Sequence, residues 1–596
     1  MASGWRGVWK LTAFAFRVDP IRSVAVLIFT VIEYAAAALI ALWLKLLVDG
    51  ITTGRDDLIY AGGAGMVGIS IILREICNWA HFPLRETMRE RTALEMDAHL
   101  MELSGRIPTL AHHESSTYLR EMERLRGESH RLANAVGNFT WNFGMMTRLA
   151  VTLALLATLD IALIAMPVCA LPAVIISARI AKHRQATRDA TAERERTAGT
   201  ILWLATESAP AKELRVFGLA PTLLQMYRDL RASTTRDHDA NNRRATLLIG
   251  SGWLIFALGY IGAIALVVSH ALDGRATTGD VVLAMNLASQ VSQEVSGLAS
   301  IVQWLQEYLL IAKRYLWLVD LSGSSRKTSR SDVPIPERLT DGIRFDDVSF
   351  AYPGTEEAVL KDVTLHFPAG STVAVVGDNG AGKTTLVKLL MRFYEPTAGR
   401  VTVDGIDLAD LEPNVWLAQT SAGFQDFVQF ELIAQETVGV GQLETVDDES
   451  AVHGALDRAN ATDVIEALPN GLSSQLGRRF EDGAQLSIGQ WQKLALGRSM
   501  MRETPVLLVL DEPTAALDPM TEHALFERYV DASRRIADVR RSITLLVSHR
   551  FSTVRMADVI VVIDSGRVTE FGSHSELMAL GGTYAELFEI QASAYR

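Results

Sequence analysis

The residues best suited to chemistry lie in one glycine-rich segment, GDNGAGKTT at residues 377–385. A run of β-forming residues, VAVV at 373–376, precedes it, so the segment is predicted to join a strand to a helix. Its spacing fits G-x-x-x-x-G-K-[ST], in which glycines let backbone N–H groups surround a phosphate at a helix N-terminus. The alternative is a chance match in a glycine-rich turn. The candidate nucleotide-binding residues of this loop are Gly377, Asp378, Asn379, Gly380, Ala381, Gly382, Lys383, Thr384 and Thr385.

Two residue types in the loop have specific roles in phosphate chemistry. Lys383 supplies a positive charge for β- and γ-phosphates, and Thr384 offers a hydroxyl to Mg²⁺. An apolar strand predicted at residues 506–510 ends in Asp511 and Glu512. Asp511 is suited to the Mg²⁺ site, and Glu512 is suited to act as general base for an attacking water. A solvated acidic turn is the alternative for this pair.

Three further side chains are candidates for the same site. Tyr352, in FAYPG, has an aromatic ring that can stack on adenine; ordinary strand packing is the alternative. Gln425, in FQDF, can reach Mg²⁺ or the attacking water, unless it is a surface amide. His549 follows the predicted strand ITLLV at 543–547 and can contact a γ-phosphate, although a lone histidine at a strand end is more often structural.

The elements around these residues indicate an α/β domain. Short β-forming runs at 371–376, 401–403, 506–510, 543–547 and 559–563 alternate with helical segments between residues 341 and 596. The segment LSGSSRKTSRSDVPIP at 321–336 is rich in serine, arginine and proline. We therefore predict a linker over residues 319–340.

The first 318 residues are predicted to form a membrane domain. Hydrophobic residues make up 49% of the chain, and the net charge of -12 argues against nucleic acid as a partner. Six apolar segments are long enough to span a bilayer, at residues 24–48, 58–76, 132–156, 161–180, 246–269 and 280–303. Gln290, Gln293 and Glu294 interrupt the sixth.

The two cysteines, Cys77 and Cys169, lie in apolar stretches and are expected to be packed thiols.

The distribution of arginine predicts the orientation of the spans. Arginines are concentrated in the long segments after spans two and four, whereas the other connecting loops carry few. The positive-inside rule therefore places both long segments and both termini in the cytoplasm. These segments have helical patterns, so we expect spanning helices that extend beyond the bilayer and turn back near 111–124 and 206–219. A plain solvated helical hairpin is the alternative for both turns.

Charged residues inside the predicted spans are costly unless they are paired or hydrated. Glu33 lies in the first span, Arg74 and Glu75 near the end of the second, Arg148 in the third and Glu294 in the sixth. We expect them to line a watery cavity together with the polar residues of the sixth span; structural ion pairs and snorkelling residues at the ends of spans are the alternatives. Glu33 and Glu294 give a slight preference for cationic cargo.

The motifs together resemble the ATP-binding cassette (ABC) family. The matches are GDNGAGKTT at 377–385 (the Walker A motif), FQDF at 424–427, LSIGQWQ at 486–492, VLLVLDEPTAALD at 506–518 and SHR at 548–550. The membrane half is similar to that of ABC exporters, and the whole chain resembles a bacterial half-transporter with one membrane domain and one cassette. The resemblance implies that ATP and Mg²⁺ are the cofactors.

The resemblance also implies a head-to-tail pair of cassettes, formed with a second copy of the chain or with a related half-transporter. Ser487, Gly489 and Gln490 would then cap the nucleotide bound to the other cassette, and the turns at 111–124 and 206–219 resemble coupling helices. The signature usually reads LSGGQ, but Ile488 replaces its first glycine here. We expect this β-branched residue to alter the rate of hydrolysis without abolishing function.

The expected function is ATP-driven export of an amphipathic small molecule, lipid or peptide across the cytoplasmic membrane by alternating access. Import on the same frame, and an ATP-gated channel or regulator, are the alternatives. The expected fold is an all-helical transmembrane domain with six spans over residues 1–318, followed by an α/β nucleotide-binding domain over residues 341–596.

Overall fold

The protein is described by a computed structural model that covers residues 2–324, 334–512, 540–548 and 550–594. These residues form two compact units. The first consists of Met1–Glu102 and Met122–Val319, and the second of Leu103–Glu121 and Asp320–Arg596. The sequence-based boundaries leave residues 103–121 in the membrane domain, whereas in the structure this segment packs with the C-terminal unit.

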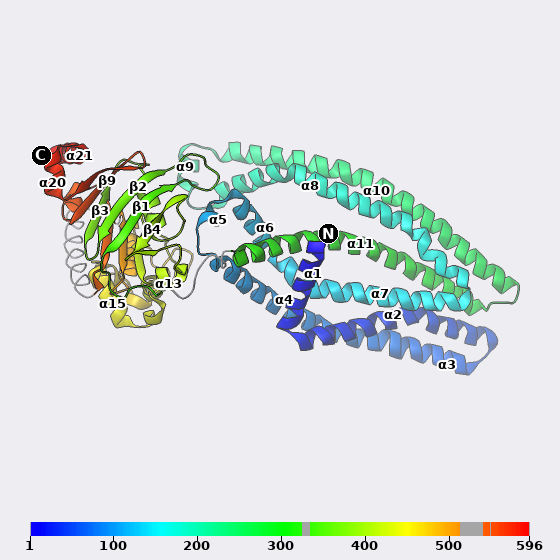
Figure 1. Cartoon of the computed structure of the whole chain (residues 1–596). Helices are drawn as coiled ribbons and strands as arrows, with labels where there is room; N and C mark the ends of the chain where they lie inside the picture. Colours follow the sequence, from blue (N-terminus) through cyan, green and yellow to red (C-terminus); the bar gives the residue numbers. More distant parts are fainter. Residues whose placement is uncertain (1, 325–333, 513–539, 549, 595–596) are drawn as a thin grey trace. The chain divides into compact units, whose positions relative to one another are not determined.

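The first unit is entirely helical in its described residues, and its long helices run side by side (Figure 1). A short N-terminal helix, α1 (Ala2–Val18), buries Leu11 and Ala15 and exposes Trp9, as an amphipathic helix does. The remaining helices of this region are α2 (Pro20–Thr53), α3 (Asp56–Ala64), the π-helix Gly65–Leu73, α4 (Arg74–Gly105), α6 (Ser116–Ala133), α7 (Ala135–Leu159), the 3₁₀ helix Ile161–Ala170, α8 (Leu171–Thr206), α9 (Ala211–Val216), α10 (Ala220–Leu272) and α11 (Thr278–Ser324).

Five helical stretches among the described residues are long and apolar enough to cross a bilayer. Four of them contain a predicted span, and Gly137–Leu159 overlaps the third predicted span, 132–156. The five stretches are Pro20–Thr53, Asp56–Gly105, Gly137–Leu159, Ile161–Thr206 and Ala220–Leu272. The sixth predicted span, 280–303, lies within α11 but is not among them. Its amides and Glu294 lower its apolarity, whereas Leu283, Leu287 and Val291 are buried in a core shared with the other helices.

The second unit is an α/β domain, as predicted, and its described residues form two sheets (Figure 1). The larger has the strand order β10-β9-β3-β8-β7-β6, in which only β10 is antiparallel to its neighbour. The smaller is antiparallel, with the order β2-β1-β4-β5. The strands are β1 (Gly342–Phe350), β2 (Leu360–Pro368), β3 (Thr372–Val376), β4 (Ala398–Val403), β5 (Ile406–Asp407), β6 (Thr420–Gly423), β7 (Leu507–Asp511), β8 (Ile543–Val547), β9 (Val559–Asp564) and β10 (Arg567–Gly572).

Strands β3, β7 and β8 are buried along their whole length, which explains their continuous apolar sequences. A core that includes Phe345, Phe367 and Trp416 joins the two sheets. A second core packs side chains from the mainly helical segment 434–501 against Leu508, Leu510 and Leu546 of the larger sheet. The helices of this unit are α5 (Ala111–Glu114), α12 (Lys383–Leu390), α13 (Pro413–Ala418), α14 (Ala434–Gly439), α15 (Glu449–Arg458), α16 (Thr462–Glu466), α17 (Ile488–Ser499), α19 (Phe551–Val554), α20 (His574–Leu580) and α21 (Thr583–Ala594), with 3₁₀ turns at Leu443–Thr445 and Gly471–Ser473.

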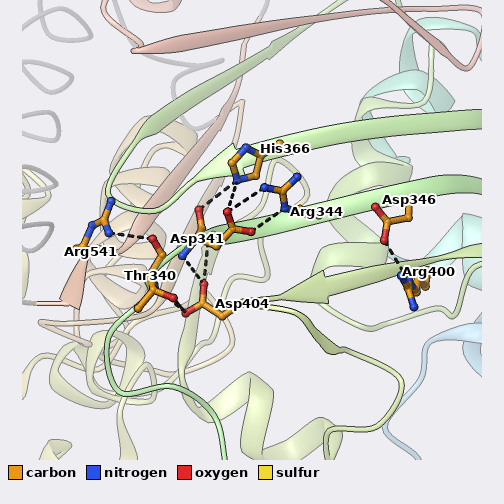
Figure 2. Close-up of polar contacts among 9 residues, drawn as sticks. Thr340, Asp341, Arg344, Asp346, His366, Arg400, Asp404 and Arg541 are labelled. Carbon is orange, nitrogen blue, oxygen red and sulfur yellow. Dashed lines mark hydrogen bonds and ion pairs between the residues drawn. The ribbon is translucent and has the colours of Figure 1, made fainter.

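A polar cluster fixes the point at which β1 begins (Figure 2). Asp404 and Gly405 both have positive φ, as the central residues of a tight hairpin between β4 and β5 do. The carboxylate of Asp404 accepts hydrogen bonds from the backbone N–H groups of Thr340 (2.8 Å), Asp341 (2.9 Å) and Gly342 (2.8 Å). Arg541 donates to the carbonyl of Thr340 at 2.9 Å. The first strand therefore begins at a fixed place, directly after the predicted linker.

Candidate active site

The glycine-rich loop joins β3 to α12, as predicted, and Gly377 shows why glycine is required there. Its φ is +153°, and a Cβ atom at this position would lie 2.1 Å from the carbonyl oxygen of Ile563 on β9. Gly382, which precedes α12, has a φ of +110°. The loop therefore passes close to the neighbouring strand before its backbone N–H groups reach the start of the helix.

Lys383 is buried, and its ammonium group closes the loop. Its Nζ donates to the carbonyl oxygens of Gly377 at 2.7 Å and Asp378 at 2.9 Å. Burial lowers the pKa of Lys383, although the carboxylates of Glu512, Asp511 and Asp378 act in the opposite direction. A positive charge is thus held at the mouth of a helix N-terminus, where an anionic group is favoured.

Strand β7 delivers the two predicted carboxylates to the same edge of the sheet as the loop. Burial, together with the charge of Glu512, raises the pKa of Asp511 to about 6, although a hydrogen bond from Thr384 opposes the shift. Glu512 has a φ of +45°, an uncommon conformation for a residue with a side chain. Its backbone N–H donates to the carbonyl of Val547 on β8 at 2.9 Å, which holds this conformation.

Gln425, which follows β6, meets Glu512 from the next strand of the sheet. Its Nε2 donates to Oε2 of Glu512 at 2.8 Å. Two side chains that are far apart in the sequence, both assigned to hydrolysis, are therefore in direct contact. The carboxyl ends of β3, β6 and β7 meet at this edge because the strands are parallel.

These residues surround a pocket of ≈ 750 Å³. It is lined by most of the predicted residues, namely Gly377, Asp378, Asn379, Gly380, Gly382, Lys383, Thr384, Thr385, Gln425, Asp511 and Glu512. Oxygen donors from a hydroxyl, a carboxylate and an amide are the ligand types that Mg²⁺ takes, and a lysine beside backbone N–H groups suits phosphates. The residues present therefore fit both ATP and Mg²⁺.

Sequence comparison places this site in a known family. The family model described as ABC transporter matches residues 360–515. The ATP-dependent lipid A-core flippase of Chromobacterium violaceum is 30% identical over 584 residues, which are 95% of each chain. The chain belongs to the ABC transporter family. The subtilin transport ATP-binding protein SpaT of Bacillus subtilis is 31% identical over 402 residues, 67% of this chain and 63% of SpaT, so that match spans less than two thirds of SpaT.

A solved structure shows the same fold. A bacterial Atm1-family ABC exporter with ATP bound superposes with a TM-score of 0.78 and 24% identity, over 96% of this chain and 98% of the other. The predicted fold class, a helical membrane domain followed by an α/β cassette, is therefore confirmed. Together with the apolar helices, the family also identifies this ABC transporter as a membrane protein.

Five of the predicted site residues that the structure describes lie outside the lining of the pocket in this ABC transporter. The side chain of Ala381 is buried in the core between the sheets, because the loop turns inward there. Ser487 caps the N-terminus of α17 and forms a reciprocal capping box with Gln490, and Gly489 lies in the first turn. These three signature residues are near Ile488, whose side chain is 66% exposed. Their assigned contact with nucleotide stays a prediction.

Tyr352 also lies outside the lining of the pocket, and its hydroxyl is 3.0 Å from the hydroxyl of Thr385, which is part of the lining. The stacking of its ring on adenine stays a prediction. His549 lies outside the described residues.

The pocket of the ABC transporter includes residues that the sequence pattern did not indicate. Phe551 begins α19, and its backbone N–H donates to Oε1 of Gln591 at 3.2 Å. Leu587 and Gln591 come from α21, near the end of the chain, and the three side chains form part of the pocket wall. Of these three residues, Phe551 is the one that lies near a motif, two residues after His549.

The charged residues predicted inside the spans lie close to an oppositely charged group or, for Glu33, to a histidine. Arg148 on α7 forms an ion pair with Glu294 on α11, which is buried. The carboxylate of Glu33 on α2 lies 3.1 Å from Nδ1 of His81 on α4. Arg74 pairs with its neighbour Glu75 at 2.6 Å. Glu294 is therefore neutralised by a base from another helix, which removes one of the two acids that favoured a cationic cargo.

Proposed function

We propose that this chain is an ATP-driven exporter in which hydrolysis in the cassette changes the conformation of the membrane unit. The observation that carries the proposal is the convergence of Lys383, Asp511, Glu512 and Gln425 on one pocket, in a chain that also has long apolar helices. The pocket can bind and hydrolyse a nucleotide, and the apolar helices can form the route by which a compound crosses the bilayer.

Each residue has a defined part in the proposed hydrolysis. Lys383 and the loop N–H groups would hold the phosphates, and Thr384, Asp511 and Gln425 would hold Mg²⁺, whose charge would offset that of the phosphates. Glu512 accepts a proton from the attacking water, and the hydrogen bond from Gln425 keeps its carboxylate in one orientation. His549 is assigned to the γ-phosphate.

We propose that the working form contains two cassettes, from two copies of this chain or from this chain and a related half-transporter. The signature residues Ser487, Gly489 and Gln490 are not part of the chain's own pocket, and α17 presents its N-terminus beside the exposed Ile488. A helix N-terminus of this kind suits a γ-phosphate on a second cassette. Because Glu512 is present, we favour two copies of the same chain.

The proposed location is the cytoplasmic membrane, with both termini in the cytoplasm, as the arginine distribution indicates. The proposed cargo is an amphipathic small molecule, lipid or peptide. The membrane unit combines apolar helices with polar groups such as Gln290, which accepts a hydrogen bond from Thr152 at 3.1 Å. Because Glu294 is paired with Arg148, the proposed cargo need not be cationic.

The test is ATPase activity and transport by the purified full-length chain in lipid vesicles of known sidedness, screened against amphipathic compounds. Export predicts that one compound stimulates hydrolysis and is moved away from the side that carries the cassettes. Movement toward that side would show an importer. An ion current, or hydrolysis that no compound stimulates, would show a channel or regulator instead.

A further inference from the structure

The segment 103–121 packs as part of the cassette unit although it lies between two helices of the membrane region. Its backbone is attached by the N–H of Leu110, which donates to the carbonyl oxygen of Phe393 at 3.1 Å. The side chains of Leu110 and Ala111 pack against the core between the two sheets. The short helix α5 is therefore fixed to the surface of the cassette at its first residues.

Glu114, the last residue of α5, completes the attachment with both oxygens of its carboxylate. Oε1 accepts a hydrogen bond from Nζ of Lys388 at 2.8 Å, and Oε2 accepts one from the hydroxyl of Tyr394. Burial alone would raise the pKa of Glu114, but the two hydrogen bonds together with the charge of Lys388 lower the pKa. The carboxylate is thus charged at neutral pH and is an ionic partner for Lys388.

Lys388 belongs to α12, the helix that starts at Lys383 of the phosphate loop. Its ammonium nitrogen lies 5.1 Å from the ring centroid of Tyr352 and 5.7 Å from that of Tyr394, within the range of a cation–π contact. The two rings meet edge to face with centroids 5.3 Å apart. One cation therefore holds two aromatic rings and one carboxylate together.

Tyr352 connects this cluster with the wall of the pocket. Its hydroxyl lies 3.0 Å from that of Thr385, and Thr385 lines the pocket. From Glu114 to the pocket the contacts are thus continuous, through Lys388, Tyr352 and Thr385. All of them lie within one compact unit.

We propose that Glu114 and Lys388 are positioning residues that hold the ring of Tyr352 for the base of the nucleotide, so that attachment of segment 103–121 sets the affinity for the base. The inference rests on the proposed nucleotide site. If the carboxylate of Glu114 is removed, Lys388 has no ionic partner and can turn to solvent. Tyr352 then loses a cation–π contact, and a base must order the ring as it binds, at a cost in affinity.

The test measures dissociation constants of ATP and of inorganic tripolyphosphate for the purified full-length chain, by competition with a fluorescent nucleotide. Tripolyphosphate has no base, so the ratio of the two constants isolates the contribution of the base. Tyr352→Ala should reduce the preference for ATP about tenfold, the usual range for loss of base stacking. Glu114→Gln and Lys388→Met should each reduce it about two- to fivefold, without weakening tripolyphosphate.

The conservative variant Lys388→Arg keeps the charge and should retain the preference of the unmodified chain. The double variant Glu114→Gln/Lys388→Met should lose no more than either single variant, because both break the same chain of contacts. Asp463→Asn is a matched control, since it breaks a lysine–carboxylate contact of 2.7 Å elsewhere in the cassette.

Two results would overturn the inference and leave the proposed function intact. One is an unchanged preference for ATP in both Glu114→Gln and Lys388→Met. The other is an equal loss of affinity for ATP and tripolyphosphate, which would mean that the pair only stabilises the fold. If the unmodified chain bound neither compound, the proposed function itself would be rejected together with the inference.

Discussion

Replacing Glu512 by glutamine should separate hydrolysis from nucleotide binding. The structure gives the reason: Oε2 of Glu512 accepts a hydrogen bond from Gln425 at 2.8 Å, and a glutamine can present its own amide oxygen to the same donor. The backbone bond from residue 512 to Val547 and the positive φ are also compatible with glutamine. The variant therefore keeps the geometry and loses only the basic group.

The size of the effect follows from the role assigned to the carboxylate. A positioned general base contributes about 10²- to 10⁴-fold to a rate, so kcat for ATP should fall by that factor. The dissociation constant for ATP should change by less than about threefold, because Lys383 and the loop N–H groups are unchanged. One further change is expected: without the charge of Glu512, the pKa of Asp511 should fall below about 6.

The assays are steady-state hydrolysis, equilibrium nucleotide binding and thermal unfolding of the full-length chain in lipid. Glu503→Gln is a suitable control, because it removes an exposed carboxylate just before β7 that is 3.4 Å from Arg458 and is not part of the lining of the pocket. Full turnover by Glu512→Gln would refute the assignment of the base. A parallel loss of binding and kcat would show that Glu512 serves the nucleotide site structurally.

Three further predictions concern the cassette. Because burial and the charge of Glu512 raise the pKa of Asp511 to about 6, above its ordinary 3.8, Mg²⁺ affinity should fall as the pH drops through about 6, by up to about tenfold per unit, which titration of Mg²⁺-dependent ATP binding measures. The contribution of Asp511 to the stability of the Mg²⁺-free fold should be full below about pH 3.8 and lost as the pH rises through about 6, which the difference in melting temperature from Asp511→Asn measures. Gly377→Ala should destabilise the chain by about 2 kcal/mol or more, because the new Cβ would meet the carbonyl oxygen of Ile563. Gly380→Ala is the control, because a Cβ there meets open space and only the strain of the positive φ remains; equal melting temperatures of the two variants would contradict the prediction. Ile488→Gly should leave the melting temperature within about 2 °C, since the side chain is 66% exposed, but should change kcat for ATP; identical kcat would show that the isoleucine does not affect the cap.

The phosphate loop illustrates what local sequence can determine. The order of β-forming residues, glycines, lysine and threonine specifies a strand, a turn and a helix, and the structure has β3, the loop and α12 at these positions. The apolar run before Asp511 likewise becomes the fully buried strand β7. These features depend on near neighbours in the chain and on patterns of burial, so the sequence was sufficient for them.

The sequence was less informative about which side chains from distant parts of the chain come together. Nothing in the spacing indicated that Ala381 turns into the core, that Leu587 and Gln591 from the last described helix line the pocket, or that Tyr352 bonds to Thr385. The sixth span was also hard to predict, since α11 combines apolar residues with amides and an acid that has a partner on α7.

By itself, then, the sequence determined the chemistry that is available, because residue types and short spacings define a phosphate loop, two carboxylates and a series of apolar helices. Only the tertiary structure decided which groups meet. The contact of Gln425 with Glu512, the ion pair of Arg148 with Glu294, and the attachment of Glu114 to Lys388 all join residues distant in the sequence. Such contacts depend on strand order and helix packing, which no local pattern encodes.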